Sequence, residues 1–243
     1  RLVVFGDSLS DTGNLGRSSN GWIWVDYLSD RLGLETIASS DGGTNYAHSG
    51  ATAIDSENTI DLNQQFTQFY QSDNSISEAD LYAIAIGGND VVGIYESDTD
   101  ASDRLNATVD RIISVLDRLV DGGAKNIVIL NVLDGGFTPL AHEENASEQI
   151  TDLVQQFNDR LETAVEDFSR DRSQIDIEFI DLFSLSHAIV ESPQRFGLPD
   201  NFIVGEPCPQ TPCDNYFFWD GVHPTTQTHA AIANWVYVQL ADD

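Results

Sequence analysis

A serine near the amino terminus and an Asp-x-x-His segment near the carboxyl terminus are the residues best suited to nucleophilic chemistry. Ser8 stands in the run Gly-Asp-Ser-Leu-Ser, directly after a short apolar segment. Asp220 lies three residues before His223, so its carboxylate can hold Nδ1 of the imidazole and leave Nε2 to act as a base. A serine hydroxyl needs such a base because it is a weak nucleophile at neutral pH. Each segment alone is typical of a surface turn, and only the combination predicts a Ser-His-Asp triad.

Two further segments contain groups that could stabilise an oxyanion. Gly50 ends the run Asn-Tyr-Ala-His-Ser-Gly, and Asn89 lies in Gly-Gly-Asn-Asp, after a second apolar segment. Acyl transfer needs hydrogen-bond donors aimed at the charge that develops on the carbonyl oxygen. The backbone amides of Ser8 and Gly50 and the side-chain amide of Asn89 would supply three such donors, although each segment taken alone is ordinary turn sequence.

Support for other catalytic or metal-binding residues is weaker. His48 lies beside Gly50 and could line the same pocket. The other histidines are expected to be surface residues of helices or loops: His142, His187 and His229. Asp98, Asp100 and Asp103 faintly resemble a calcium loop, but the glycine and the terminal glutamate of that motif are missing. We therefore expect no metal site.

The elements that must position these residues alternate between strand and helix. Short apolar segments predict strands at residues 2–5, 81–86, 126–133 and 177–183, with a further strand at 34–37. Apolar residues at helical spacing predict helices over 22–32, 105–119, 150–168 and 232–240. This alternation favours βαβ units and a parallel sheet covered on both faces. We expect one three-layer α/β/α domain over residues 1–243, with its chemistry beyond the carboxyl ends of the strands.

Taken together, these segments resemble the SGNH or GDSL-type serine esterases and lipases. Residues 6–10 match the first block of that family, Gly50 the second, residues 87–90 the third and residues 220–224 the fifth. Flanking segments resemble the branch shared by plant GDSL lipases and bacterial lecithinase/hemolysin-like esterases: residues 16–21, 135–140, 157–161 and 218–220. Four blocks in the correct order, over nearly the whole chain, make the resemblance highly specific.

The resemblance implies a flavodoxin-like fold with a central parallel sheet of about five strands. It implies that Ser8 is the nucleophile, His223 the base and acid, and Asp220 the residue that orients His223, with Ser8, Gly50 and Asn89 forming the oxyanion hole. No cofactor is implied, and the substrate would be a small-molecule or lipid acyl ester. The alternatives are phospholipid deacylation, acyl transfer to an alcohol, or a non-catalytic carbohydrate- or lipid-binding domain.

Composition narrows the class of partner. The 243 residues include 40 acidic and 11 basic side chains, which gives a formal net charge of −29, and Lys125 is the single lysine. A nucleic-acid backbone would be repelled, and anionic membrane surfaces are disfavoured for the same reason. Halophilic proteins tolerate such an excess of acids, as do some extracellular ones. No stretch of about 18 apolar residues exists, so no transmembrane segment is expected, and the oligomeric state is not predicted.

Two cysteines indicate where the protein is located relative to the cytoplasm. Cys208 and Cys213 enclose Pro-Gln-Thr-Pro, and a disulfide is the preferred interpretation, which would place the protein outside the cytoplasm. Two free thiols or a metal pair are the alternatives, and the lack of a second cysteine pair disfavours structural zinc. Because the chain opens on Arg1 and a strand, we expect that a leader has been removed and that the protein is secreted or held at the cell surface.

Overall fold

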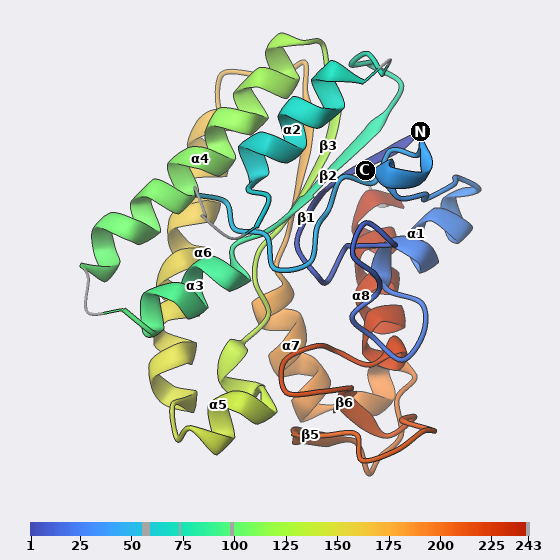
Figure 1. The fold of residues 1–243 in the computed structure, drawn as a ribbon, viewed down its shortest axis with the longest axis vertical. Coiled ribbons are helices and arrows are strands. Elements are labelled where there is room, and N and C mark those ends of the chain that lie inside the picture. The colour runs from blue at the N-terminus through green and yellow to red at the C-terminus, as the bar shows by residue number, and fades with distance from the viewer. Residues whose placement is uncertain (55–58, 73, 98–99, 242–243) are drawn as a thin grey trace.

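In the computed structural model, a parallel sheet forms the middle layer of the molecule (Figure 1). The structure describes residues 1–54, 59–72, 74–97 and 100–241. The strands of the sheet are β1 (Leu2–Gly6), β2 (Leu81–Ala85), β3 (Asn126–Leu130) and β4 (Asp176–Ile180), paired in that order and all parallel. The four main strand predictions are confirmed, although β3 and β4 end three residues earlier than predicted.

The fifth strand, predicted at residues 34–37, is wrong. Those residues form a loop that runs to an isolated bridge between Ala38 and Asn45. The place beside β1 is taken instead by the segment around Asn45, which also makes a parallel bridge to Val4. Val4 donates its backbone N–H to Thr44 at 3.0 Å and accepts from Tyr46 at 2.8 Å. If this segment is counted as the second strand, the order becomes 2-1-3-4-5, as in flavodoxin.

The sheet lies between two layers of helices. Successive residues of a strand point to opposite faces, so each strand contributes side chains to both layers. One face packs against α2 (Leu62–Gln71), α3 (Gly88–Tyr95), α4 (Ala101–Asp121) and α6 (Ser147–Ser169). The other packs against α1 (Trp24–Leu32), α7 (Leu182–Glu191) and α8 (Thr226–Ala241). Figure 1 shows the two groups of helices on opposite sides of the strands. The three-layer α/β/α class is therefore confirmed.

The helices predicted from apolar spacing are α1, α4, α6 and α8, whereas α2, α3, α7 and the short α5 (Pro139–Glu143) were not predicted. Phe183, predicted to end a strand, lies in α7 because Asp181 stops β4 and caps the helix by accepting from the N–H of Ser184 at 3.0 Å. Short 3₁₀ helices lie at Ser39–Asp41, Gly135–Phe137 and Pro193–Phe196. No helix in the described part of the chain has the length and apolar character needed to cross a bilayer.

A small second sheet, which the sequence patterns did not predict, lies at one end of the molecule (Figure 1). Its strands, β5 (Ile203–Pro207) and β6 (Tyr216–Phe218), are parallel. Between them, Cys208 and Cys213 form a disulfide, which confirms the predicted pairing. The chain then passes through a tight loop into α8, and that loop contains Asp220 and His223.

Candidate active site

The Ser8 turn follows β1 directly and is held by its neighbour. Asp7 accepts a hydrogen bond from the N–H of Leu9 on its side chain and one from Ser10 on its carbonyl, both at 3.0 Å. These two bonds form a tight turn that presents Ser8 at the carboxyl end of the sheet. Gly6, at the end of β1, must lack a side chain because a Cβ would lie 2.5 Å from the carbonyl oxygen of Ala85.

A buried glutamine, which sequence reasoning missed, fixes the backbone just before this turn. Gln65 of α2 accepts from the N–H of Gly6 at 2.9 Å and donates to its carbonyl at 2.8 Å. The side chain is fully buried, and it satisfies both backbone groups as a neighbouring strand would. One signal could have identified it, since Gln65 is a polar residue in the apolar stripe of Leu62, Phe66 and Phe69.

The loop after β6 brings Asp220 and His223 to Ser8. His223 Nε2 lies 3.0 Å from Ser8 Oγ, and His223 Nδ1 lies 2.8 and 3.0 Å from the two carboxylate oxygens of Asp220. Asp220 also accepts from the backbone N–H groups of Val222 and His223, at 2.9 and 2.7 Å. Burial alone would raise the pKa of Asp220, but these hydrogen bonds outweigh it and the pKa is lowered. The carboxylate is therefore ionised at neutral pH.

A hydrogen bond connects Asn89 to the turn that contains Gly50. The N–H of Ala51 donates to the carbonyl of His48 at 3.0 Å, so residues 48–51 form a turn. Gly50 has a φ of 80°, which a type II turn requires at its third position. The hydrogen bond that closes this turn uses the N–H of Ala51 and not that of Gly50. Asn89 donates from Nδ2 to the carbonyl of Ala51 at 2.8 Å, which ties this turn to the start of α3.

Two buried carboxylates, also missed from the sequence, hold the same loops. Asp90 accepts from the backbone N–H groups of Ala53 and Ile54 at 2.8 and 3.2 Å. Asp11 accepts from Ser49 at 2.9 Å and from three backbone N–H groups of its own loop. Both are almost wholly buried. The Ser8 loop and the Gly50 turn are thereby held to each other and to α3.

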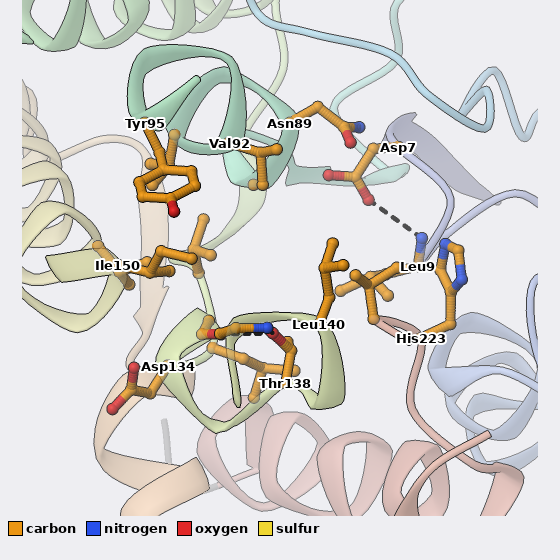
Figure 2. Close-up of a pocket in the computed structure, with 18 of the residues that line it drawn as sticks. Asp7, Leu9, Asn89, Val92, Tyr95, Asp134, Thr138, Leu140, Ile150 and His223 are labelled. Atoms are coloured by element: carbon orange, nitrogen blue, oxygen red, sulfur yellow. Dashed lines mark hydrogen bonds between the residues drawn. The ribbon is translucent and has the colours of Figure 1, made fainter. Parts of the chain in front are cut away.

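A cavity of about 280 Å³ opens beside Ser8 and is lined mainly by apolar side chains. Figure 2 shows these side chains around the cavity, with His223, Leu9 and Asp7 near one end and Tyr95 and Ile150 near the other. The polar groups on its wall include Asp7 and Asn89. Burial raises the pKa of Asp7 to about 6, partly offset by the Leu9 N–H and by the nearby ring of His223.

The remaining histidines lie elsewhere. His48 lines a separate polar hollow with Asn14, Tyr46 and Gln68, and not the pocket of Ser8. His142 is exposed and His187 is half-exposed, as predicted for surface residues. The surface prediction for His229 is wrong, because its ring is fully buried and Nδ1 accepts from the N–H of Trp24 at 3.3 Å. Burial lowers the pKa of His229 to about 3, which keeps the ring neutral.

Asp100 and Asp103, from the acidic run that faintly resembles a calcium loop, lie at the start of α4. Among the residues that the structure describes, no group of three or more His, Cys, Asp or Glu side chains is placed to hold an ion. Asp98 lies outside the described residues. Asp100 caps α4, since its side chain accepts from the N–H of Ser102 at 3.0 Å, and Asp103 lies in the first turn of that helix, where acids are favoured.

Comparison with known proteins gives one family. The sequence profile of the family described as GDSL-like lipase/acylhydrolase matches residues 2–236. Lipase 1 of Photorhabdus luminescens is 36% identical over 148 residues, which are 57% of this chain and 23% of that protein. The phosphatidylcholine-sterol acyltransferase of Aeromonas hydrophila is 27% identical over 311 residues, covering 96% of this chain and 88% of that protein.

Solved structures give the same fold. The lipase Lip_vut3 from a goat rumen metagenome superposes with a TM-score of 0.60, over 98% of this chain and 96% of that one, at 15% identity. At that identity the likeness concerns the fold alone. The chain aligns to less than a quarter of Lipase 1, so what that whole protein does is not transferred with the match.

Proposed function

Because the chain belongs to the GDSL-like lipase/acylhydrolase family, we propose that it hydrolyses carboxylic esters through an acyl-enzyme on Ser8. The single observation that carries this proposal is the chain of contacts from Ser8 Oγ through His223 to Asp220, at 3.0 and 2.8 Å. These residues come from opposite ends of the sequence, and a non-catalytic binding domain would have no need of this arrangement. No cofactor takes part in the proposed reaction.

In the first half of the reaction, Ser8 Oγ attacks the carbonyl carbon of the ester while His223 Nε2 takes the hydroxyl proton. Asp220 stabilises the imidazolium that forms. The negative charge on the carbonyl oxygen is then met by the N–H groups of Ser8 and Gly50 and by the second Nδ2 hydrogen of Asn89. The intermediate collapses, His223 gives its proton to the alcohol oxygen, and the alcohol leaves.

In the second half, water enters where the alcohol left. His223 takes a proton from the water, which attacks the acyl-enzyme. The second intermediate then collapses as His223 returns this proton to Ser8 Oγ, which releases the free acid and restores the Ser8 hydroxyl. Asp220 and the oxyanion donors act as before, because both halves pass through the same kind of tetrahedral intermediate.

A second candidate is acyl transfer, with an alcohol in place of water. The observation in its favour is the match to an acyltransferase from Aeromonas hydrophila over 96% of this chain. The side chain of His223 is 22% exposed, so an acceptor alcohol could reach Nε2 by the same route as water. Product analysis with and without an added alcohol separates the two, since transfer yields a new ester and hydrolysis yields the acid.

The location proposed for the protein is outside the cytoplasm. The Cys208–Cys213 disulfide supports it, because such bonds persist mainly in oxidising compartments. Detection of the protein in culture medium or on intact cells would test this location.

Replacement of the proposed nucleophile is the direct test. Ser8→Ala should reduce kcat for p-nitrophenyl esters by up to about 10⁶-fold, the loss seen when a triad serine is removed. The fold should persist, because Asp7 holds the turn through the N–H groups of Leu9 and Ser10. The Ser8 hydroxyl instead contacts His223 Nε2.

A matched control is Ser40→Ala, which changes an exposed serine outside the Ser8 pocket and should keep full activity. A fluorophosphonate should label the wild-type protein on Ser8 and leave Ser8→Ala unlabelled. Activity of Ser8→Ala within tenfold of wild type, or labelling of another serine, would contradict the proposal.

A further inference from the structure

We propose that the cavity beside Ser8 binds a straight acyl chain of medium length, so that the preferred substrates are medium-chain fatty acyl esters and not acetates. This inference rests on the proposed function and adds its substrate class. The wall of the cavity supplies the first support, because most of it is apolar. Val92, Tyr95 and Ile150 lie on the side away from His223 (Figure 2), and Val132, Leu140 and Val154 also line the cavity. Such a surface gains free energy when it covers methylene groups.

The length of the cavity can be estimated along α3. Asn89, near Ser8, and Glu96, just past the end of this helix, both line the cavity. Seven residues of helix at about 1.5 Å each separate them by roughly 10 Å. An extended hydrocarbon chain advances about 1.3 Å per carbon, given single bonds of about 1.5 Å. The cavity therefore accommodates a chain of about eight carbons.

The volume is compatible with such a chain. The cavity of about 280 Å³ lies near the lower end of the range of roughly 300–1,000 Å³ for pockets that bury small-molecule ligands. An acetyl group would leave most of the apolar wall without a contact, whereas a palmitoyl chain would extend beyond it.

The chain in the cavity belongs to the acid and not to the alcohol. The alcohol oxygen must face His223 Nε2, which returns the proton, and the His223 side chain is partly exposed to solvent. The cavity runs away from that ring along α3, from Asn89 to Val92 and Tyr95 (Figure 2). With the carbonyl oxygen at Asn89, the alcohol side points towards solvent and the acyl side points into the cavity.

Two acidic side chains on the rim of the cavity add a charge requirement. Glu96 and Glu144 line the cavity and are exposed. The length estimated along α3 places the end of an eight-carbon chain near Glu96. An acyl chain that ends in a methyl group is accepted there, while one that ends in a carboxylate is repelled.

The first experiment measures kcat/KM for p-nitrophenyl esters from acetate to palmitate. The value for octanoate should exceed that for acetate by at least about tenfold, since even one methylene in an apolar pocket is worth about 10-fold or more. An active enzyme that prefers acetate would overturn the acyl-chain proposal and leave ester hydrolysis intact. Absence of turnover on every ester, with no fluorophosphonate label on Ser8, would instead overturn the proposed function.

Two isomeric esters identify which side of the ester enters the cavity. Ethyl octanoate and octyl acetate have the same composition and differ only in the position of the carbonyl group. Faster hydrolysis of ethyl octanoate is expected. Faster hydrolysis of octyl acetate would show that the cavity holds the alcohol chain and would overturn the proposal.

Narrowing the cavity tests its wall. Val92 and Leu140 line it and are 37% and 38% exposed, so Val92→Trp and Leu140→Trp can be made without overpacking the core. Each should lower the ratio of octanoate to acetate kcat/KM by about tenfold or more. Val190→Trp is the control, because Val190 is 39% exposed on α7 and does not line the cavity. Equal ratios in all three variants and the wild type would contradict the inference.

The acidic rim is tested with a p-nitrophenyl ester of octanedioic acid, whose free carboxylate lies at the end of the chain. It should react at least about fivefold more slowly than octanoate, and Glu96→Gln combined with Glu144→Gln should reduce that difference. Equal rates for the two esters in the wild type would show that the chain end does not reach these glutamates.

Discussion

At the scale of single residues, Asn89 combines two functions in one amide group. One Nδ2 hydrogen donates to the carbonyl of Ala51 at 2.8 Å and so places the Gly50 turn. The other hydrogen is left for the proposed oxyanion. The amide is thus fixed before substrate arrives, and fixed donors are effective because no reorganisation is needed during the reaction.

The prediction for Asn89→Ala follows from the second function. An oxyanion donor acts mainly in the transition state, so kcat should fall by about 10²- to 10³-fold while KM changes little. Steady-state kinetics on p-nitrophenyl esters measures both constants, and thermal unfolding of the variant reports the loss of the Ala51 contact separately. An unchanged kcat with a raised KM would identify Asn89 as a group that binds the ground state.

The residues proposed to do the chemistry could be selected from the sequence because acyl transfer demands particular side chains. Ser8, Asp220 and His223 are of this kind, and the structure brings them together as expected. Gln65 and Asp11 could not be predicted in the same way, since they act by hydrogen bonding to backbone groups that only the fold brings near. His229 was placed wrongly for a related reason, because α8 is apolar around most of its circumference and one polar residue within it is buried with the rest.

At the scale of elements, the apolar strands of the main sheet and the long helices α4 and α6 were predictable from their patterns, whereas the second sheet was not. The strands β1 to β3 are nearly continuous apolar runs, as expected for a parallel sheet buried on both faces, whereas β4 (Asp-Ile-Glu-Phe-Ile) alternates polar and apolar residues and is less buried. Strand β5 (Ile-Val-Gly-Glu-Pro) contains a glycine, a glutamate and a proline and has no fully buried residue, and β6 has only three residues, so no clear pattern marks them. Asn45 takes the edge of the sheet through isolated bridges alone, and such a contact depends on tertiary structure.

The disulfide is attached to β6, the strand that precedes the loop of Asp220 and His223. The N–H of Cys208 donates to Phe218 at 3.0 Å, and the carbonyl of Cys213 accepts from Tyr216 at 3.1 Å. Both cysteines are therefore bonded to β6, which leads directly into the loop of Asp220 and His223. Loss of the covalent link should loosen this loop.

The double change Cys208→Ser and Cys213→Ser should lower the free energy of unfolding by less than about 3 kcal/mol, the value for a 15-residue loop, because this loop is shorter. It should also lower kcat/KM. Denaturant unfolding and ester kinetics measure the two effects, with Gln210→Ala as a control inside the same loop. Two titratable thiols in the unfolded, unreduced wild type would contradict the pairing.

At the scale of the whole molecule, three buried groups make stability depend on pH. Burial raises the pKa of Asp7 and of Asp90 from 3.8 to about 6. Between these values the folded state binds more protons than the unfolded state, so stability falls as the pH rises through this range. Burial lowers the pKa of His229 from 6.5 to about 3, and this one group has the opposite effect.

Two acids outweigh one histidine, and protonation of surface carboxylates also reduces repulsion. The melting temperature should therefore increase as the pH is lowered from about 7 to about 5. Below about 4 it should decrease, as the carboxylates with lowered pKa values become protonated: Asp80, Asp181 and Asp220. Calorimetry at constant ionic strength measures this curve, and Asp7→Asn should flatten its rise. A steady decrease in melting temperature from about pH 7 to about pH 5 would contradict the dominance of Asp7 and Asp90.

The net charge of −29 affects the stability of the folded state independently of these buried groups. Some of the few basic side chains are already paired, as in Arg1 with Asp80 and Arg17 with Asp26. Most carboxylates therefore repel one another across the surface, and this repulsion destabilises the compact state. Salt weakens the ion pairs as well, but the unpaired acids are far more numerous.

Screening should accordingly raise the melting temperature between about 0.1 and 1 M NaCl, as the Debye length shortens from about 10 to about 3 Å. If repulsion alone acts, most of the gain should come early in this range. A further rise well beyond about 1 M would indicate a halophilic source, where stronger apolar burial also contributes. An uncharged ester needs no electrostatic steering, so its kcat/KM should change less than stability does, whereas a choline ester should lose rate with salt. A flat or falling melting temperature would show that self-repulsion does not limit this fold.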